Sequence, residues 1–282
     1  MKRLFLIFIT CLSALAILSG QQEFPAGSPL FPVIEKWHEV SVDPNQAEAM
    51  RAMNQPKDQP FRFAIPVEVS LTPFNSGFLA TRGPETIWVL PISSKGALSL
   101  NIIMSPYNLP QGAYVYVYDY NRQIIRGAFT RESASGSFSM PVMPVPGERM
   151  VLECHFPGNR MPEKAVCVTQ VAHDFIGFFG PGDLKDFYYG RSDDCEIDLN
   201  CSTNSSYLTS SRSVVRLLVA GTELCTGVMV NNTGNEYKPY LLTANHCIES
   251  QSHASNTVFV LNYRSPGCDG PDMTNMYTMT GS

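Results

Sequence analysis

The stretch Leu242-Thr243-Ala244-Asn245-His246-Cys247 places a histidine next to a cysteine after a run of small residues. A second cysteine, Cys225, opens an apolar run upstream, and a disulfide between Cys225 and Cys247 would clamp the loop that carries His246. A general base must keep one ring nitrogen aimed at its partner throughout a reaction, so a covalent clamp beside it has a clear use. The alternative is a buried structural histidine in a disulfide-bonded β protein. We take His246 as the candidate catalytic residue.

Further motifs precede this stretch. They are Cys195-Glu196-Ile197-Asp198-Leu199-Asn200-Cys201, Cys225-Thr226-Gly227 and Val230-Asn231-Asn232-Thr233-Gly234-Asn235. As a set they closely resemble the bacterial lysyl endopeptidases, which are trypsin-like serine proteases, over roughly residues 190–268. The chain departs from the wider family at Asn245, where an alanine is usual. The resemblance implies that His246 is the general base and that disulfides join Cys225 to Cys247 and Cys201 to Cys268.

The other members of a catalytic triad are not recognisable in these 282 residues. The sequence contains no Gly-Asp-Ser-Gly or Gly-Ser-Ser-Gly motif, and Ser282 is its last residue. Asp269 and Asp272 follow Cys268 in a loop, whereas the family's triad aspartate belongs to a short apolar strand context. A serine protease needs all three groups. We therefore expect the chain to be an incomplete N-terminal portion of a serine endopeptidase, inactive by itself.

The first twenty residues have the features of a secretory signal peptide. Lys2 and Arg3 precede an apolar run over residues 4–18, which is short for a membrane span, and Ser19-Gly20 supplies small residues for cleavage. We expect a secreted protein, located in the periplasm, at the cell surface or outside the cell. Such compartments are oxidising, so its cysteines are expected to form disulfides.

The cysteine count is odd in the exported part of the chain. Removing Cys11 with the leader leaves seven of the eight cysteines. Cys154 and Cys167 are the two in their region, and we predict that they pair with each other. In the resembled family the partner of Cys195 lies far downstream, so Cys195 is expected to be unpaired here because of truncation.

The region before the protease-like motifs is predicted to be all-β. Residues 21–60 form a polar linker with one short helix, for which Asp43 is the expected N-cap and Pro44 the first helical residue. Residues 61–189 contain regularly spaced short apolar runs, which predict an antiparallel β-sandwich of jelly-roll type. The predicted strands are residues 63–69, 86–92, 97–104, 113–118, 124–129, 150–156 and 165–171.

Two features of this region bear on function. In Tyr114-Val115-Tyr116-Val117-Tyr118 the tyrosines should face one side and the valines the other; the tyrosine face is either a packed or wetted surface or an aromatic platform for sugar or peptide. The region also resembles the β domain that precedes many secreted bacterial trypsin-like proteases, which implies a prosegment. The motifs that carry this resemblance contain Trp88 and residues 109–113, 127–130, 144–148 and 171–173.

Residues 190–282 are expected to form the first β-barrel portion of a trypsin-like domain. The predicted partners are a protein or peptide substrate and the chain's own prosegment. A net charge of -5 without a basic cluster argues against nucleic acid, and no membrane contact is expected after signal cleavage. No cofactor is expected, and zinc at His246, Cys247 and His253 is disfavoured because adjacent ligands rarely reach one ion. The rival hypothesis is a non-catalytic secreted binding protein with a β-sandwich module and a vestigial protease segment.

Overall fold

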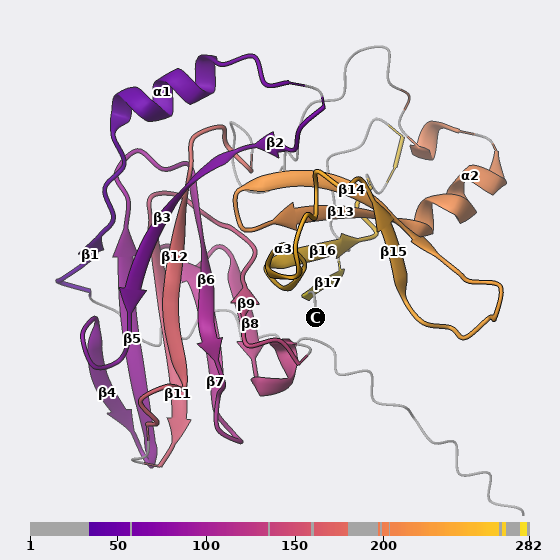
Figure 1. The fold of residues 1–282 in the computed structure, drawn as a ribbon. Coiled ribbons are helices and arrows are strands. Elements are labelled where there is room, and N and C mark those ends of the chain that lie inside the picture. The colour runs from indigo at the N-terminus through magenta and orange to yellow at the C-terminus, as the bar shows by residue number, and fades with distance from the viewer. Residues whose placement is uncertain are drawn as a thin grey trace, which may run out of the picture.

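The computed structural model of the chain describes residues 34–56, 58–134, 136–158, 161–179, 197, 199–202, 204–264, 267–268 and 277–280. Strands dominate the described residues and form three sheets, which confirms the predicted all-β class (Figure 1). No described helix is long and apolar enough to cross a membrane. The predicted signal peptide, Cys195, Asp269 and Asp272 lie outside the described residues.

The first sheet of the sandwich has six described strands. Its strands, in spatial order, are β1 (His38–Glu39), β5 (Glu85–Ser93), β11 (Arg149–Pro157), β7 (Tyr114–Asp119) and β8 (Ile125–Phe129), with β4 (Phe78–Arg82) also on β5. All of its pairs are antiparallel except β1 with β5, which is parallel. This parallel pair lies at the edge where the segment predicted as a linker joins the sheet, outside residues 61–189, for which the antiparallel sandwich was predicted.

The second sheet packs face to face with the first. Its strands are β10 (Val145–Pro146), β6 (Ser99–Tyr107), β12 (Val166–Asp174) and β3 (Ala64–Leu71), with β9 (Met140–Pro141) also on β6. One apolar cluster contains Trp88 and Leu152 of the first sheet together with Ile102 and Val168 of the second. This shared core between two layers is the predicted β-sandwich.

The tyrosine and valine alternation in β7 is confirmed. Val115 and Val117 lie in the core between the sheets, while Tyr116 and Tyr118 pack on the opposite face of the first sheet. The Tyr118 hydroxyl donates a hydrogen bond to the buried carboxylate of Glu153. Both tyrosines are buried, so this face is a packed surface rather than an open aromatic platform.

The predicted disulfide between Cys154 and Cys167 is wrong: both thiols are free and buried. Cys154 lies on β11 and faces the core between the sheets. Cys167 lies on β12 of the other sheet, and its Sγ is 3.9 Å from Ser70 Oγ. The neighbours of Cys167, Val166 and Val168, face the core, so strand alternation directs Cys167 to the outer face of its sheet. The two sulfurs therefore lie on opposite sides of the second sheet.

The expected helix is α1 (Pro44–Ala52), and it is docked on the sandwich (Figure 1). The Asp43 side chain caps it by accepting a hydrogen bond from the Asn45 N–H at 2.9 Å. Ala47 contacts the sandwich in a small cluster with Ile65 and Phe175.

The third sheet lies beside the sandwich and contains Cys225 and the strand that leads to His246. Its strands are β15 (Tyr240–Thr243), β14 (Glu223–Val230), β13 (Val214–Val219), β16 (Thr257–Leu261) and β17 (Tyr277–Thr280), with β2 (Phe61–Arg62) also on β14. Its short helices are η2 (Leu199–Cys201), α2 (Ser205–Ser210), η3 (Ser211–Ser213) and α3 (Gln251–Ser255), and the sandwich holds η1 (Arg131–Ala134). The described strands leave this sheet open, with β15 and β17 as its edges.

The sandwich and the third sheet share a buried boundary. Leu218 of β13 and Val258 of β16 belong to the same apolar cluster as the sandwich core. Asn101 of β6 donates a hydrogen bond to the carbonyl of Gly221 at 2.7 Å, and Gln170 of β12 donates to the carbonyl of Ala220 at 2.8 Å. The turn between β13 and β14 is thus held by side chains of the second sheet.

Candidate functional site

His246 lies in the turn that follows β15. This strand pairs with β14 in an antiparallel register that places Thr243 opposite Gly227, and the Thr243 hydroxyl donates to the carbonyl of Thr226 at 2.8 Å. The turn is closed by a hydrogen bond from the Cys247 N–H to the carbonyl of Ala244 at 3.0 Å. The chain is therefore held on both sides of the histidine, whose own side chain is exposed.

A disulfide fixes this turn to the neighbouring strand. Cys247 is buried and bonded to Cys225 of β14, with a Cα–Cα distance of 6.1 Å. Gly227 permits the close approach of the two strands, because a Cβ there would lie 2.9 Å from the side chain of Leu241. The histidine turn is thus cross-linked to β14.

The second disulfide joins Cys201 to Cys268 with a Cα–Cα distance of 4.5 Å. These two pairs are the ones that the family resemblance implied. Cys201 ends η2, before the third sheet, and Cys268 follows β16 along the chain. The bridge therefore spans most of the protease-like segment.

The His246 imidazole has no hydrogen-bond partner among the described residues. The described serines that follow it, Ser250, Ser252 and Ser255, form hydrogen bonds within α3 and its ends. Among the described residues, Glu249 forms no ion pair with His246. The exposed ring is free to exchange a proton with a group that approaches from solvent.

The sulfurs of Cys225 and Cys247 and a ring nitrogen of His246 lie within 4.8 Å of one another. Such a group has the ligand types of a zinc site. The two sulfurs are bonded to each other, however, and a disulfide does not provide the thiolates that bind zinc. The geometry fits a clamped histidine better than a metal centre.

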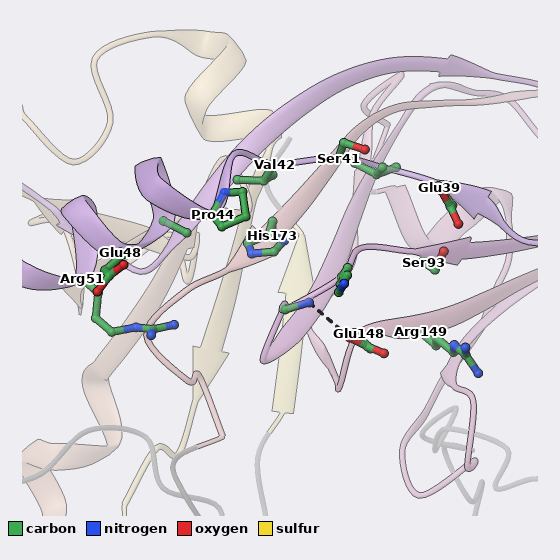
Figure 2. A pocket seen from close by; sticks show the side chains of 14 residues that line it. Glu39, Ser41, Val42, Pro44, Glu48, Arg51, Ser93, Glu148, Arg149 and His173 are labelled. Carbon is green, nitrogen blue, oxygen red and sulfur yellow. Dashed lines mark hydrogen bonds between the residues drawn. The ribbon is translucent and has the colours of Figure 1, made fainter.

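The structure also contains a cavity of about 690 Å³ that sequence reasoning missed. It lies between α1 and the sandwich, and His173 of β12 lines it (Figure 2). His173 Nδ1 is 2.8 Å from Ser94 Oγ, and Ser94 is 79 positions away in sequence. Nothing in the sequence indicates this long-range pair.

Comparisons with known proteins match the C-terminal third of the chain, which contains His246, to one family. Residues 189–282 match the family model described as lysyl endopeptidase, C-terminal domain. The chain is 25% identical over 203 residues to the lysyl endopeptidase of Pseudomonas aeruginosa. That alignment covers 67% of this chain and 43% of the relative, so the chain spans less than half of the relative's length.

A shorter part of the chain is similar to a protein that is not called an endopeptidase. The chain is 42% identical over 62 residues to the secreted RxLR effector protein 73 of Plasmopara viticola, covering 21% of this chain and 14% of that protein. No solved structure matches the chain.

Proposed function

We propose that this chain is part of the precursor of a secreted serine endopeptidase. The similarity of the chain to lysyl endopeptidases supports this proposal. His246 is the general base in this proposal. The observation that carries it is the exposed imidazole on a turn clamped by Cys225–Cys247, within the segment that matches the lysyl endopeptidase C-terminal domain.

The proposed chemistry follows from what an imidazole does beside a serine. His246 takes the serine proton as the oxygen attacks a peptide carbonyl, and it later returns the proton to the leaving amine. The clamp at Cys225–Cys247 limits the motion of the turn, so the ring keeps its orientation between the two transfers. The serine and the aspartate are supplied by groups that the 282 residues do not show in recognisable motifs.

The β-sandwich is the prosegment in this proposal. It contacts the third sheet through the turn held by Asn101 and Gln170 and through the pairing of β2 with β14. These contacts leave His246 exposed, so the sandwich supports the sheet without burying the base. Secretion is proposed from the leader sequence and is supported by the two disulfides, which form in oxidising compartments.

Cleavage after lysine is the specificity that the name of the Pseudomonas relative favours. A matched pair of fluorogenic peptides that differ only in lysine or norleucine before the scissile bond tests it. We expect turnover of the lysine peptide alone, and equal turnover of both would contradict lysine specificity without affecting the proposed class of enzyme.

The proposal is tested by comparing two proteins, the 282-residue chain and the product of the longest reading frame that contains it. We expect the longer protein to hydrolyse peptides and to react with a fluorophosphonate probe, whereas the 282-residue chain does neither. Covalent labelling of the 282-residue chain at a serine would contradict its predicted inactivity. Absence of labelling and of hydrolysis in the longer, folded protein would contradict the serine endopeptidase proposal.

The alternative is a non-catalytic secreted binding protein. Two observations favour it: the similarity of part of the chain to a secreted effector, and the lack of a described hydrogen-bond partner for His246. In that case the folded longer protein would neither hydrolyse peptides nor react with the probe, and would instead retain a binding partner on its sandwich.

A further inference from the structure

The cavity beside α1 contains a buried histidine with one nitrogen available to a ligand. Ser94 Oγ donates its single proton to the carbonyl of Val40 at 2.8 Å, so it must accept the hydrogen bond that joins it to His173 Nδ1. The proton of His173 therefore lies on Nδ1, and Nε2 carries the lone pair. His173 is 3% exposed, and its Nε2 has no partner among the described residues.

Burial keeps this ring neutral. Desolvation lowers the pKa of His173 below its ordinary value, and the positive charge of Arg51 lowers it further. A neutral imidazole with its proton on Nδ1 offers Nε2 as a hydrogen-bond acceptor at neutral pH. The ring is thus prepared to receive an N–H or O–H donor from a molecule in the cavity.

Two positively charged side chains, from different parts of the fold, line the same cavity. Arg51 extends from α1, where its Nε donates to the carbonyl of Phe175 at 2.7 Å (Figure 2). That bond fixes the guanidinium and leaves its terminal NH₂ groups without a described partner. Lys95, in the turn after β5, also lines the cavity and has no described partner. Guanidinium and ammonium groups bind carboxylates by charge-assisted hydrogen bonds.

Carboxylates complete the charged lining. Glu48 comes from α1, Glu39 from β1 and Glu148 from the turn before β11, where it accepts the Gly96 N–H at 3.2 Å. Together with the third cation, Arg149, the lining holds three acidic and three basic side chains. A simple anion such as phosphate would meet three like charges there, whereas a ligand with both signs would match the lining.

We propose that this cavity binds the C-terminal end of a short peptide, with the carboxylate on Arg51 and Lys95 and a peptide N–H on His173 Nε2. Val42, Pro44 and Ala47 provide an apolar wall for a peptide side chain. The cavity volume lies within the range of about 300–1,000 Å³ that is usual for small-ligand sites. None of the lining residues belongs to the His246 turn, so the site is independent of the proposed function.

Calorimetric titration of the purified chain with trialanine tests the proposal. Trialanine amide lacks the carboxylate, acetate lacks the peptide N–H groups, and inorganic phosphate represents a free oxyanion. We expect saturable binding of trialanine, and binding of the amide and of acetate that is weaker by about tenfold or more, as the loss of one charge-assisted contact predicts. Equal affinity for the amide, or binding of phosphate with no binding of trialanine, would overturn the proposal.

Substitutions of Arg51 and of His173 test the two proposed contacts separately. Arg51→Gln removes the charge and should weaken trialanine binding by about tenfold or more. His173→Asn keeps an N–H for Ser94 but removes the Nε2 acceptor. It should therefore weaken the binding of trialanine and leave the binding of acetate unchanged. Arg212→Gln, an exposed cation on η3, is the matched control and should bind like the parent chain. Trialanine affinity that is unchanged in Lys95→Ala and in a folded His173→Asn would contradict the site.

Discussion

Gly221 occupies the turn where the third sheet meets the sandwich, and its position excludes a side chain. Its φ is +71°, and a Cβ would lie 2.5 Å from Asn101 Oδ1, a buried atom on β6. Gly83 has a similar φ of +58°, but a Cβ there would meet nothing within 4 Å. A comparison of the two glycines therefore separates the energetic cost of a side chain at positive φ from the cost of a steric collision.

We predict that Gly221→Ala lowers the free energy of unfolding by roughly 1–3 kcal/mol more than Gly83→Ala does. Both substitutions introduce the same methyl group at a positive φ, so the difference reports the collision with Asn101 and the tight contact with Gln170. Urea denaturation followed by fluorescence measures it. Equal losses in the two variants would show that the turn does not press against the sandwich.

His173 should make the stability of the sandwich depend on pH. Because its pKa is lowered in the folded state, the unfolded chain binds a proton first as the pH falls. The free energy of unfolding should therefore decrease as the pH drops from about 6.5 toward the lower folded-state pKa. His173→Asn removes this titration, so its stability should fall less steeply over the same range. Denaturation series at several pH values compare the slopes, and identical slopes would contradict a neutral buried His173.

Some candidate functional residues could be predicted from the sequence, and others could not for a physical reason. His246 and its neighbouring cysteines lie in short motifs, so local pattern and family resemblance locate them. Ser94 and His173 are brought together only by the packing of β12 against the turn after β5. No local pattern in the sequence encodes that distance, so the cavity could not be predicted.

At the scale of elements, the longer strands were predictable and the shortest were not. The nine-residue strands β5, β6, β11 and β12 carry long apolar runs. In contrast, β2, β9 and β10 contain two residues each, too few to show a period, and exist because a neighbouring strand offers a free edge. The wrong pairing of Cys154 with Cys167 has a similar origin, since proximity in sequence does not reveal which face of a strand a side chain takes.

We predict that Cys154 and Cys167 are reduced in exported protein, while Cys225–Cys247 and Cys201–Cys268 are bridged. Burial raises the pKa of the Cys154 thiol well above its ordinary value, so this thiol should not react with iodoacetamide until the chain is unfolded. Peptide mapping without reduction, after alkylation in native buffer and in urea, makes the comparison. A peptide containing Cys154 linked to Cys167, or a free thiol at Cys247, would contradict the structure.

At the scale of the whole molecule, the sandwich and the third sheet have a common apolar core. Leu218 and Val258 contribute to that core from the third sheet, and β2 extends the third sheet from the sandwich side. Figure 1 shows the third sheet, which contains the strands that hold the histidine turn, beside the sandwich. The sequence predicted two successive β units, but their common core depends on contacts between distant strands that no local motif indicates.

The central claim is that His246 acts as a general base. The most direct test is the specific activity of His246→Ala in the longest reading frame that contains these residues, with His38→Ala as a matched control on β1. The imidazole acts mainly in the transition state, so we predict that kcat falls by at least about 10⁴-fold while KM changes little. The control should retain full turnover, and secretion and folding should be normal in both. Near-normal kcat in correctly folded His246→Ala protein would contradict the account.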